Sequence, residues 1–329
     1  MALLTPLAFD TAQRALLDYG LELERLEPMV EGSVNSNFRL WTSEGQRYFA
    51  RIYEEQAPDG ALAELKLVGE LDGLGIPVAP ALEQKDGSLL HEVAGKPFAV
   101  FPWVPGDILC QARVTTSATR TLGQTLARLH QSTASVTPLG RGRFGPENLN
   151  ERLALVAREG DPALQSAARD VQHELLTLLP RRNPELPKGV THTDLFRDNV
   201  LWSGNAIQAL LDFESAAQGS FVYDLMVTLL AWCYGSTLDP ELALGLLSGY
   251  HEVRPLSEAE LSELEIEGRF ACLRFATTRM TDYSLRCAQG AAPGRDFRRF
   301  LARKRELEQG ALLPLLDRLR AQGQSATLS

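Results

Sequence analysis

Residues 189–202 read Gly-Val-Thr-His-Thr-Asp-Leu-Phe-Arg-Asp-Asn-Val-Leu-Trp, and residues 210–214 read Leu-Leu-Asp-Phe-Glu. Asp194 is followed by Asn199 five residues later and by Asp212 a further thirteen residues on. Strand-like apolar runs precede both aspartates, so rigid elements would carry the two carboxylates. This layout suits a site in which one carboxylate handles a substrate hydroxyl while an amide and a second carboxylate hold magnesium on ATP.

The loop that contains Asp194 follows the catalytic-loop pattern of protein kinases, His-Arg-Asp-Leu-x-x-x-Asn, except that Thr193 replaces the arginine. The segment after Asp212 also departs from that pattern, since it lacks the glycine of Asp-Phe-Gly and no Ala-Pro-Glu follows. The next expected helix begins at Phe221, which leaves no room for a long regulatory loop. We therefore expect a kinase of small molecules, with Asp194 as the catalytic base and Asn199 and Asp212 as the magnesium ligands.

Composition places the chain among water-soluble globular proteins of about two domains, with 329 residues, 44% hydrophobic and 23% charged. A net charge of −9 argues against nucleic acid and anionic membranes as main partners. The N-terminus does not have the pattern of a signal peptide, and no apolar run is long enough for a membrane span, so we expect a cytoplasmic setting. The four cysteines form no Cys-x-x-Cys pair and are expected to be small buried side chains in a reducing compartment. The sequence leaves the oligomeric state open.

Strand candidates dominate the first hundred residues, and long helices dominate the rest. We expect strands at 26–30, 38–41, 47–53, 78–83, 88–93 and 97–103, and helices at 9–19 and 60–74. After a Pro- and Gly-rich hinge we expect helices at 115–132, 148–159, 162–179, 221–235, 240–251, 257–286 and 295–322, with strand-like interruptions only at 189–191 and 207–213. The prediction is an α+β fold with an antiparallel-sheet N-lobe for ATP at 1–103 and a helical C-lobe with the catalytic loop, metal ligands and acceptor site at 104–329.

The N-terminal half supplies candidates for the nucleotide. A small polar segment lies between two strands, and its backbone N–H groups would cap phosphates; an ordinary hairpin loop is the alternative. Its members are Gly32, Ser33, Asn35, Ser36 and Asn37.

Arg51 lies where the third strand of a kinase carries its phosphate-binding lysine, and an arginine also binds phosphate through its donor fork. Glu64 on the following helix is the candidate that orients Arg51, with Glu70 as the second choice. Phe101, Trp103 and Val104 belong to the strand that would pair adenine with backbone groups, although Trp103 fits a plain core position equally well.

Further polar residues are expected to support the catalytic loop. His192 is interpreted as a brace of the loop, and Asp198 as an exposed or loop-capping carboxylate. Asp224 opens an apolar helix, where it either caps that helix or supports the catalytic-loop backbone.

Several of these motifs resemble the aminoglycoside-phosphotransferase/choline-kinase superfamily, which has a protein-kinase-like fold. The resemblance covers roughly residues 10 to 320, and the run Thr191–Trp202 (THTDLFRDNVLW) is most similar to the homoserine kinases of this fold. It implies ATP-dependent phosphorylation of the homoserine hydroxyl, a step toward threonine, with magnesium bound as two ions. The motifs that carry it are Phe98–Gly106 (FAVFPWVPG), Leu122–His130 (LGQTLARLH), His192–Asn199 and Leu211–Phe213.

A homoserine site must satisfy both an ammonium and a carboxylate. Glu214 or Asp282 would bind the ammonium, and Arg279 or Arg274 would bind the carboxylate. The alternatives are another acceptor in the same superfamily, such as an aminoglycoside, choline or another amino alcohol, a methylthio-sugar or a protein serine or threonine, and a pseudokinase that binds nucleotide without turnover.

Overall fold

The structure, a computed structural model, describes residues 5–29, 34–132, 136–137, 140, 142–285 and 295–326. The chain forms two compact units. The first comprises residues 1–107 and 200–214, and the second comprises residues 108–199 and 215–329. The sequence boundary after residue 103 leaves residues 200–214 in the second lobe, whereas the first unit contains them.

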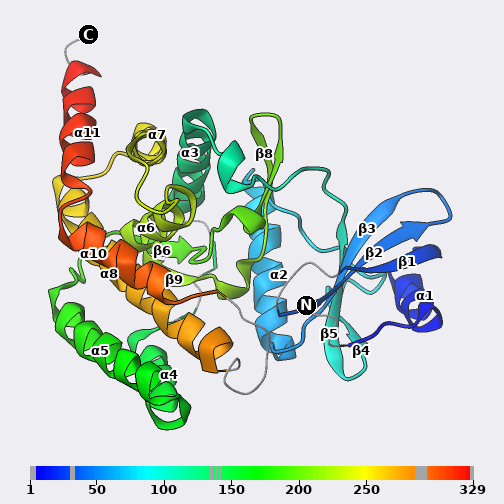
Figure 1. The fold of residues 1–329 in the computed structure, drawn as a ribbon. Coiled ribbons are helices and arrows are strands. Elements are labelled where there is room, and N and C mark those ends of the chain that lie inside the picture. Colours follow the sequence, from blue (N-terminus) through cyan, green and yellow to red (C-terminus); the bar gives the residue numbers. More distant parts are fainter. Residues whose placement is uncertain are drawn as a thin grey trace. The chain divides into compact units, whose positions relative to one another are not determined.

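An antiparallel sheet of five strands forms the centre of the first unit (Figure 1), in the order β1-β2-β3-β5-β4. The strands are β1 (Leu23–Met29), β2 (Ser36–Thr42), β3 (Arg47–Ile52), β4 (His91–Val93) and β5 (Lys96–Pro102), and the helices are α1 (Phe9–Asp18) and α2 (Pro58–Gly73).

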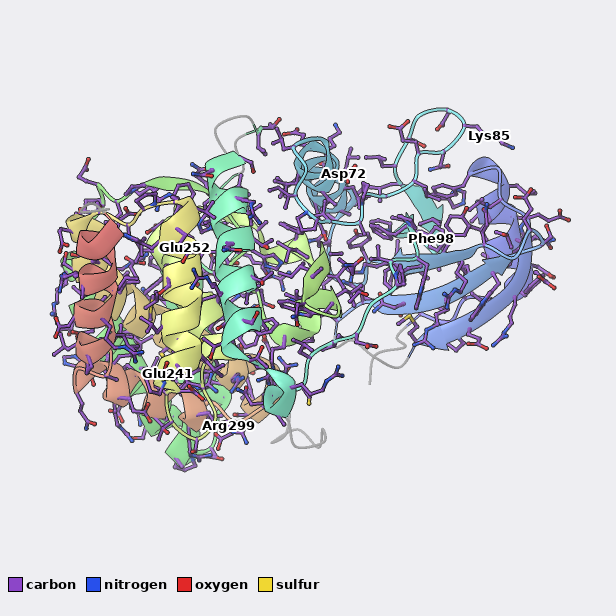
Figure 2. All side chains as sticks on the ribbon, turned by 90° about the horizontal axis from the view of Figure 1, so that it is seen from above. Asp72, Lys85, Phe98, Glu241, Glu252 and Arg299 are labelled. Atoms are coloured by element: carbon purple, nitrogen blue, oxygen red, sulfur yellow. The ribbon has the colours of Figure 1, made fainter. Side chains whose placement is uncertain are left out.

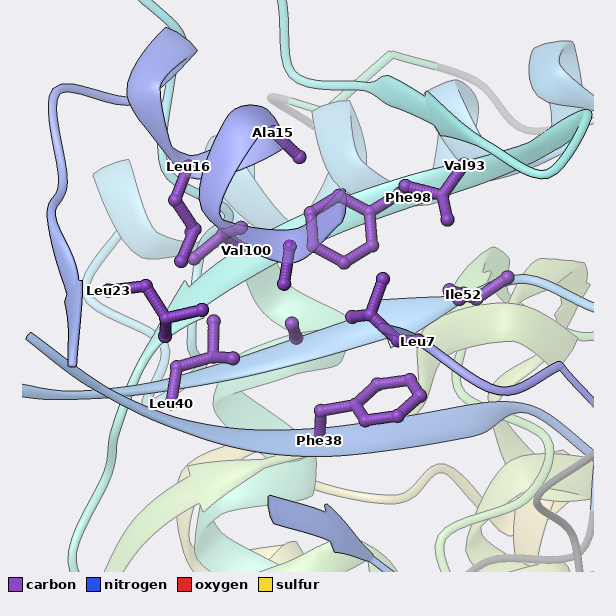
Figure 3. Packing of buried hydrophobic residues seen from close by; sticks show 12 residues of the cluster. Leu7, Ala15, Leu16, Leu23, Phe38, Leu40, Ile52, Val93, Phe98 and Val100 are labelled. Carbon is purple, nitrogen blue, oxygen red and sulfur yellow. The ribbon is translucent and has the colours of Figure 1, made fainter. Parts of the chain in front are cut away.

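Strand alternation creates the hydrophobic core of this unit. On β3, Ala50 and Ile52 join a buried cluster with Phe38, Phe98 and Leu16 of α1 (Figure 3). Each fully buried large side chain of this kind contributes about 1.5–3 kcal/mol. The strand expected at 47–53 is confirmed as β3, and its alternation places Arg51 on the face opposite Ala50 and Ile52.

A hairpin of β7 (Val200–Ser203) and β8 (Ala206–Leu210) completes the first unit, and Gly204 takes a positive φ of 58° in its turn. Trp202 exchanges two backbone hydrogen bonds with Asp107 at 2.8 and 2.9 Å.

The strands expected in the region before β4 were wrong in part. The strand predicted at 78–83 is reduced to a single bridge between Val78 and Leu210, and Pro80, which lacks an N–H donor, interrupts any longer ladder. The strand predicted at 88–93 shortens to β4.

The second unit is mainly helical, as predicted. Its helices are α3 (Thr116–Ser132), α4 (Pro146–Glu159), α5 (Pro162–Leu178), α6 (Phe221–Trp232), α7 (Pro240–Val253), α8 (Glu258–Arg279), α10 (Arg298–Glu308) and α11 (Leu313–Ala326). Short helical turns are η1 (Gln111–Arg113), η3 (Leu179–Arg181), η4 (Arg197–Asn199), η5 (Phe213–Ser215), which starts in the first unit, and the π-helix η6 (Met280–Leu285).

Several boundaries of this unit differ from the sequence prediction. A short antiparallel pair consists of β6 (Lys188–Thr191), which was expected at 189–191, and β9 (Ala217–Ser220), which was not expected. Strand β7 was also missed. The helix expected at 295–322 is broken at Gly310, which has a φ of 82°. The helix expected at 257–286 changes into η6 after Arg279.

Helices α3 and α7 lie side by side in Figure 2, with Glu252 near the end of α7 accepting a hydrogen bond from Gln124 of α3 at 3.1 Å. Glycines permit this close approach. A Cβ on Gly249 would lie 2.1 Å from the carbonyl oxygen of Arg120, and one on Gly123 would lie 2.2 Å from that of Leu246. This packing places His130, at the end of α3, beside Tyr250 of α7.

The cysteine prediction holds in part. Cys233 and Cys272 are buried, but Cys110 is exposed because it lies in the loop before η1; Cys287 lies outside the described residues. Of the helices within the described ranges, none combines the length and the apolar character that a membrane crossing requires.

Candidate active site

The catalytic loop begins where β6 ends, and its backbone is held in an uncommon conformation. Thr193 has a φ of 61°, in the left-handed region that a β-branched residue rarely adopts. Asp224 accepts hydrogen bonds from the backbone N–H groups of His192 at 2.8 Å and Thr193 at 2.7 Å. The Thr193 hydroxyl donates to the Ser215 carbonyl at 2.7 Å. These bonds fix the turn that presents Asp194.

Asp224 is fully buried in the first turn of α6, where the helix dipole favours a negative charge. Burial alone acts to raise its pKa, but the hydrogen bond and charge of His130, 3.0 Å away, outweigh burial and lower the pKa. The His130 ring also contacts the Tyr250 hydroxyl at 2.7 Å. Asp224 therefore supports the catalytic-loop backbone as a carboxylate. The sequence raised this role for Asp224 but gave no role to His130.

Asp194 is paired with a buried arginine. Its side chain is 34% exposed, and its Oδ1 lies 3.3 Å from Nη1 of Arg274 on α8, whose side chain is only 2% exposed. The guanidinium of Arg274 lies 4.0 Å from the ring centre of Phe144 and 3.8 Å from that of Phe275. Its Nε is buried and has no hydrogen-bond partner among the described residues. These contacts hold Arg274 against one oxygen of the Asp194 carboxylate.

Asn199 ends the loop in η4 and is tied to the same residue. Its amide nitrogen donates to the Asp194 carbonyl at 2.8 Å, which leaves the amide oxygen available as a ligand. The indole N–H of Trp232 donates to the Leu195 carbonyl at 2.9 Å. Asp198 points elsewhere, forming an exposed ion pair with Arg295 at 3.0 Å. Sequence reasoning found Asn199 from its spacing and assigned no role to Trp232.

In the first unit, Arg51 of β3 forms the centre of a polar cluster. Its Nε donates to Asn37 at 3.3 Å, and its Nη1 lies 3.3 Å from Asp212 and 3.9 Å from Glu64 of α2. Of the two glutamates that the sequence offered, Glu64 is the one for which the structure gives an ion pair with Arg51.

The charges in this cluster are unequal. Burial raises the pKa of the Glu64 carboxyl to about 8, against the opposing effect of Arg51, since Asp212 and Glu214 add negative charge nearby. Burial acts to lower the pKa of Arg51, but Asp212, Tyr53 and Glu64 outweigh it and raise that pKa. Arg51 is therefore a permanent cation at the centre of a group of acidic side chains.

Asp212 follows β8 with a positive φ of 64°, so the chain turns sharply as its carboxylate leaves the strand. Glu214 accepts a hydrogen bond from the Asn35 side chain at 2.9 Å, and Asn35 in turn accepts one from the Glu54 N–H at 3.1 Å. Ser36 is engaged with Thr5 and Glu54, which is a packing role within the unit. Gly32 and Ser33 lie outside the described residues.

The segment expected to bind adenine continues from β5. Phe101 packs against Phe49 with ring centres 5.7 Å apart. Trp103 is half-buried, and the guanidinium groups of Arg39 and Arg47 lie 5.7 and 5.4 Å from its ring centre. Trp103 is therefore not a plain core residue, and Val104 beside it is half-buried as well.

The acceptor candidates separate into different environments. Arg279 donates to the Asp296 carbonyl at 2.9 Å, and burial together with Arg295 and Arg303 lowers its pKa to about 10. Asp282 on η6 pairs with Arg152 of α4 at 2.9 Å. Sequence reasoning missed Arg152, since nothing in its local pattern distinguishes it from other surface-helix arginines.

The sequence profile of a phosphotransferase enzyme family matches residues 25–261 of this chain, a range that includes Asp194, Asn199 and Asp212. The chain belongs to this family. Accordingly it is an enzyme, a phosphotransferase that uses a hydroxyl group as acceptor. The recognition made from the motifs is confirmed.

Two relatives illustrate the breadth of the match. A homoserine kinase of Methylorubrum populi is 31% identical over 287 residues, which cover 86% of this chain and 88% of the relative. A homoserine kinase of Gluconobacter oxydans is 29% identical over 318 residues, which cover 94% and 99%.

Solved structures share the fold. An amicoumacin kinase in complex with AMP-PNP, Ca2+ and Ami superposes with a TM-score of 0.72 at 20% identity, covering 92% of this chain and 93% of that one. A choline/ethanolamine kinase family protein of Mesorhizobium loti gives 0.63 at 19% identity, covering 95% and 99%. The predicted kinase-like α+β fold is thereby confirmed.

Proposed function

We propose that this protein is an ATP-dependent homoserine kinase that converts L-homoserine to O-phospho-L-homoserine. The observation that carries the choice of acceptor is the match to relatives named homoserine kinase over nearly the full length of both chains. The catalytic loop supports the reaction class, because Asp194 is exposed enough to reach a hydroxyl and is held in place by Arg274.

In the proposed reaction Asp194 accepts the proton of the acceptor hydroxyl as its oxygen attacks the γ-phosphorus of ATP. The bond between that phosphorus and the bridging oxygen breaks, and ADP leaves with the electron pair. Arg274 pairs with the Asp194 carboxylate and so would hold it in position for the acceptor. Arg51, oriented by Glu64, would contact the ATP phosphates.

The donor set fits magnesium. Asn199 offers an amide oxygen and Asp212 a carboxylate, and Mg2+ in kinases is typically held by one or two such ligands together with phosphate oxygens. When bound, the metal neutralises charge that develops on the transferring phosphoryl group. Within the described residues no three His, Cys, Asp or Glu side chains gather as an all-protein metal cage.

An acceptor screen tests this proposal. ADP release is measured with ATP, Mg2+ and each of L-homoserine, choline, an aminoglycoside and a sugar. We expect the highest kcat/KM with L-homoserine. A higher value with choline or an aminoglycoside would move the enzyme to another acceptor of the same family, and nucleotide binding without any acceptor-stimulated turnover would favour a pseudokinase.

A further inference from the structure

The second unit contains an ion pair close to the catalytic loop that the reaction steps above do not use. Arg152 of α4 donates to Asp282 of η6 at 2.9 Å and to the Thr281 hydroxyl at 2.7 Å. The two charged side chains are 28% and 41% exposed, so a small solute can reach both. Surface ion pairs of this kind contribute little to stability, which leaves room for another role.

Phe144 lies near both this pair and Arg274. The guanidinium of Arg274, which holds Asp194, lies 4.0 Å from the Phe144 ring centre, and the guanidinium of Arg152 lies 5.7 Å from the same centre. The Phe144 ring is thus near both Arg274, which pairs with Asp194, and the accessible ion pair of Arg152 with Asp282. Homoserine has its reacting hydroxyl two methylene groups from a carbon that bears an ammonium and a carboxylate, so its charged head must lie a short distance from Asp194.

The backbone that carries Asp282 is also unusual. α8 changes to a π-helix over Met280–Leu285, and π-helical segments occur frequently at functional sites because they redirect side chains. Here the change follows directly after Arg279, and Asp282 and Thr281 both face Arg152. Arg274 is less accessible to a small solute than Arg152, since its side chain is only 2% exposed and is paired with Asp194.

We propose that Arg152 and Asp282 recognise the charged head of an α-amino-acid acceptor, Arg152 binding its carboxylate and Asp282 its ammonium. This assignment rests on the proposed homoserine kinase activity and names the residues that select its substrate class. Binding exchanges the pair's mutual contact for contacts with the zwitterion, so no charge is left without a partner. The same arrangement disfavours acceptors that lack either charge.

Measuring three acceptors with each of two single variants tests the assignment of Arg152 and Asp282. The acceptors are L-homoserine, 3-aminopropan-1-ol, which lacks the carboxylate, and 4-hydroxybutanoate, which lacks the ammonium, each measured as substrate or competitive inhibitor. Arg152→Gln should raise the KM or Ki of homoserine and 4-hydroxybutanoate about 10- to 100-fold and leave 3-aminopropan-1-ol unchanged. Asp282→Asn should raise the KM or Ki of homoserine and 3-aminopropan-1-ol by a similar factor and leave that of 4-hydroxybutanoate unchanged. The KM of ATP should not change in either variant.

Two controls separate recognition from structure. Arg158→Gln removes another ion-paired arginine of α4 and should leave every acceptor constant unchanged. The double variant Arg152→Asp with Asp282→Arg keeps an ion pair but reverses its polarity, so homoserine binding should stay lost, whereas a purely structural pair would be restored.

The outcomes distinguish the two levels of the proposal. If the unaltered protein phosphorylates homoserine, and both single variants have the same KM and Ki values for the acceptors as the unaltered protein, the assignment of Arg152 and Asp282 is overturned but the proposed function is not. Absence of homoserine phosphorylation by the unaltered protein would overturn the proposed function and this assignment together.

Discussion

Replacing Arg274 by glutamine tests the view that a buried cation positions the catalytic carboxylate. An ion pair at the observed 3.3 Å is worth about 5 kcal/mol at an effective dielectric constant of 20. Because Asp194 is 34% exposed, water screens the pair, and a net effect of about 1–3 kcal/mol on the ionised form is expected. Removing the Arg274 cation disfavours the ionised form of Asp194. The acidic limb of the profile of kcat/KM against pH should therefore move to higher pH by about 1–2 units. Loss of orientation should lower kcat about 10- to 100-fold.

The assay is steady-state ADP release from pH 5 to 9 with saturating Mg-ATP. Arg274→Lys retains the charge and should restore most of the acidic limb while losing the fit between the rings of Phe144 and Phe275. Arg182 is a matched control, since it pairs with Glu267 at 2.7 Å and lies 3.8 Å from the Phe270 ring centre without contact to the catalytic loop. Arg182→Gln should lower the melting temperature and leave the acidic limb in place. An unchanged limb in Arg274→Gln would refute the positioning role.

Three further predictions concern the base, the Arg51 cluster and the helix packing. Asp194→Asn should lower kcat about 10²- to 10⁴-fold and change the Kd of Mg-ATP less than about threefold, measured by calorimetry; a near-normal kcat would exclude Asp194 as the base. Glu64 has its folded-state pKa raised from 4.5 to about 8, so it binds an extra proton in the folded state, and its effect destabilises the fold progressively as pH rises from about 4.5 to 8. The free energy of unfolding of Glu64→Gln, measured relative to the nucleotide-free wild type by urea titration, should therefore be higher at pH 9 than at pH 5, by at most about 5 kcal/mol. The same difference from wild type at both pH values would contradict this. Gly249→Val should destabilise the second unit by at least about 3 kcal/mol because its Cβ would meet the Arg120 carbonyl at 2.1 Å, whereas Gly235→Ala, with no atom within 4 Å, should have little effect on the urea midpoint.

The elements that sequence predicts well are those with long patterns. Helices of the second unit and strands β2, β3 and β5 follow from periodicity that extends over several turns or alternations. Strands β7 and β9 were missed because each is short, and β9 also pairs with β6, which is distant in the chain. The transition of α8 into η6 was not predicted, because the sequence around Met280 continues a helical pattern.

The candidate site shows the same division. Asp194, Asn199 and Asp212, the proposed base and metal ligands, could be picked out from sequence because their spacing follows the catalytic-loop pattern of kinases. The partners that hold them are distant in sequence and have generic local patterns. Arg274 lies 80 residues from Asp194, and Arg152 lies 130 residues from Asp282. The sequence offered Arg274 only as a ligand for the acceptor carboxylate, whereas the structure shows it paired with Asp194 and buried.

The most direct test of the central claim is phosphorus NMR of the purified protein with ATP, Mg2+ and L-homoserine. We predict that a phosphomonoester signal of O-phospho-L-homoserine grows in proportion to ADP, and that Asp194→Asn slows this growth about 10²- to 10⁴-fold while still binding Mg-ATP. If ATP is stable in the presence of homoserine, or if phosphate is released without the phosphomonoester, the protein is not a homoserine kinase.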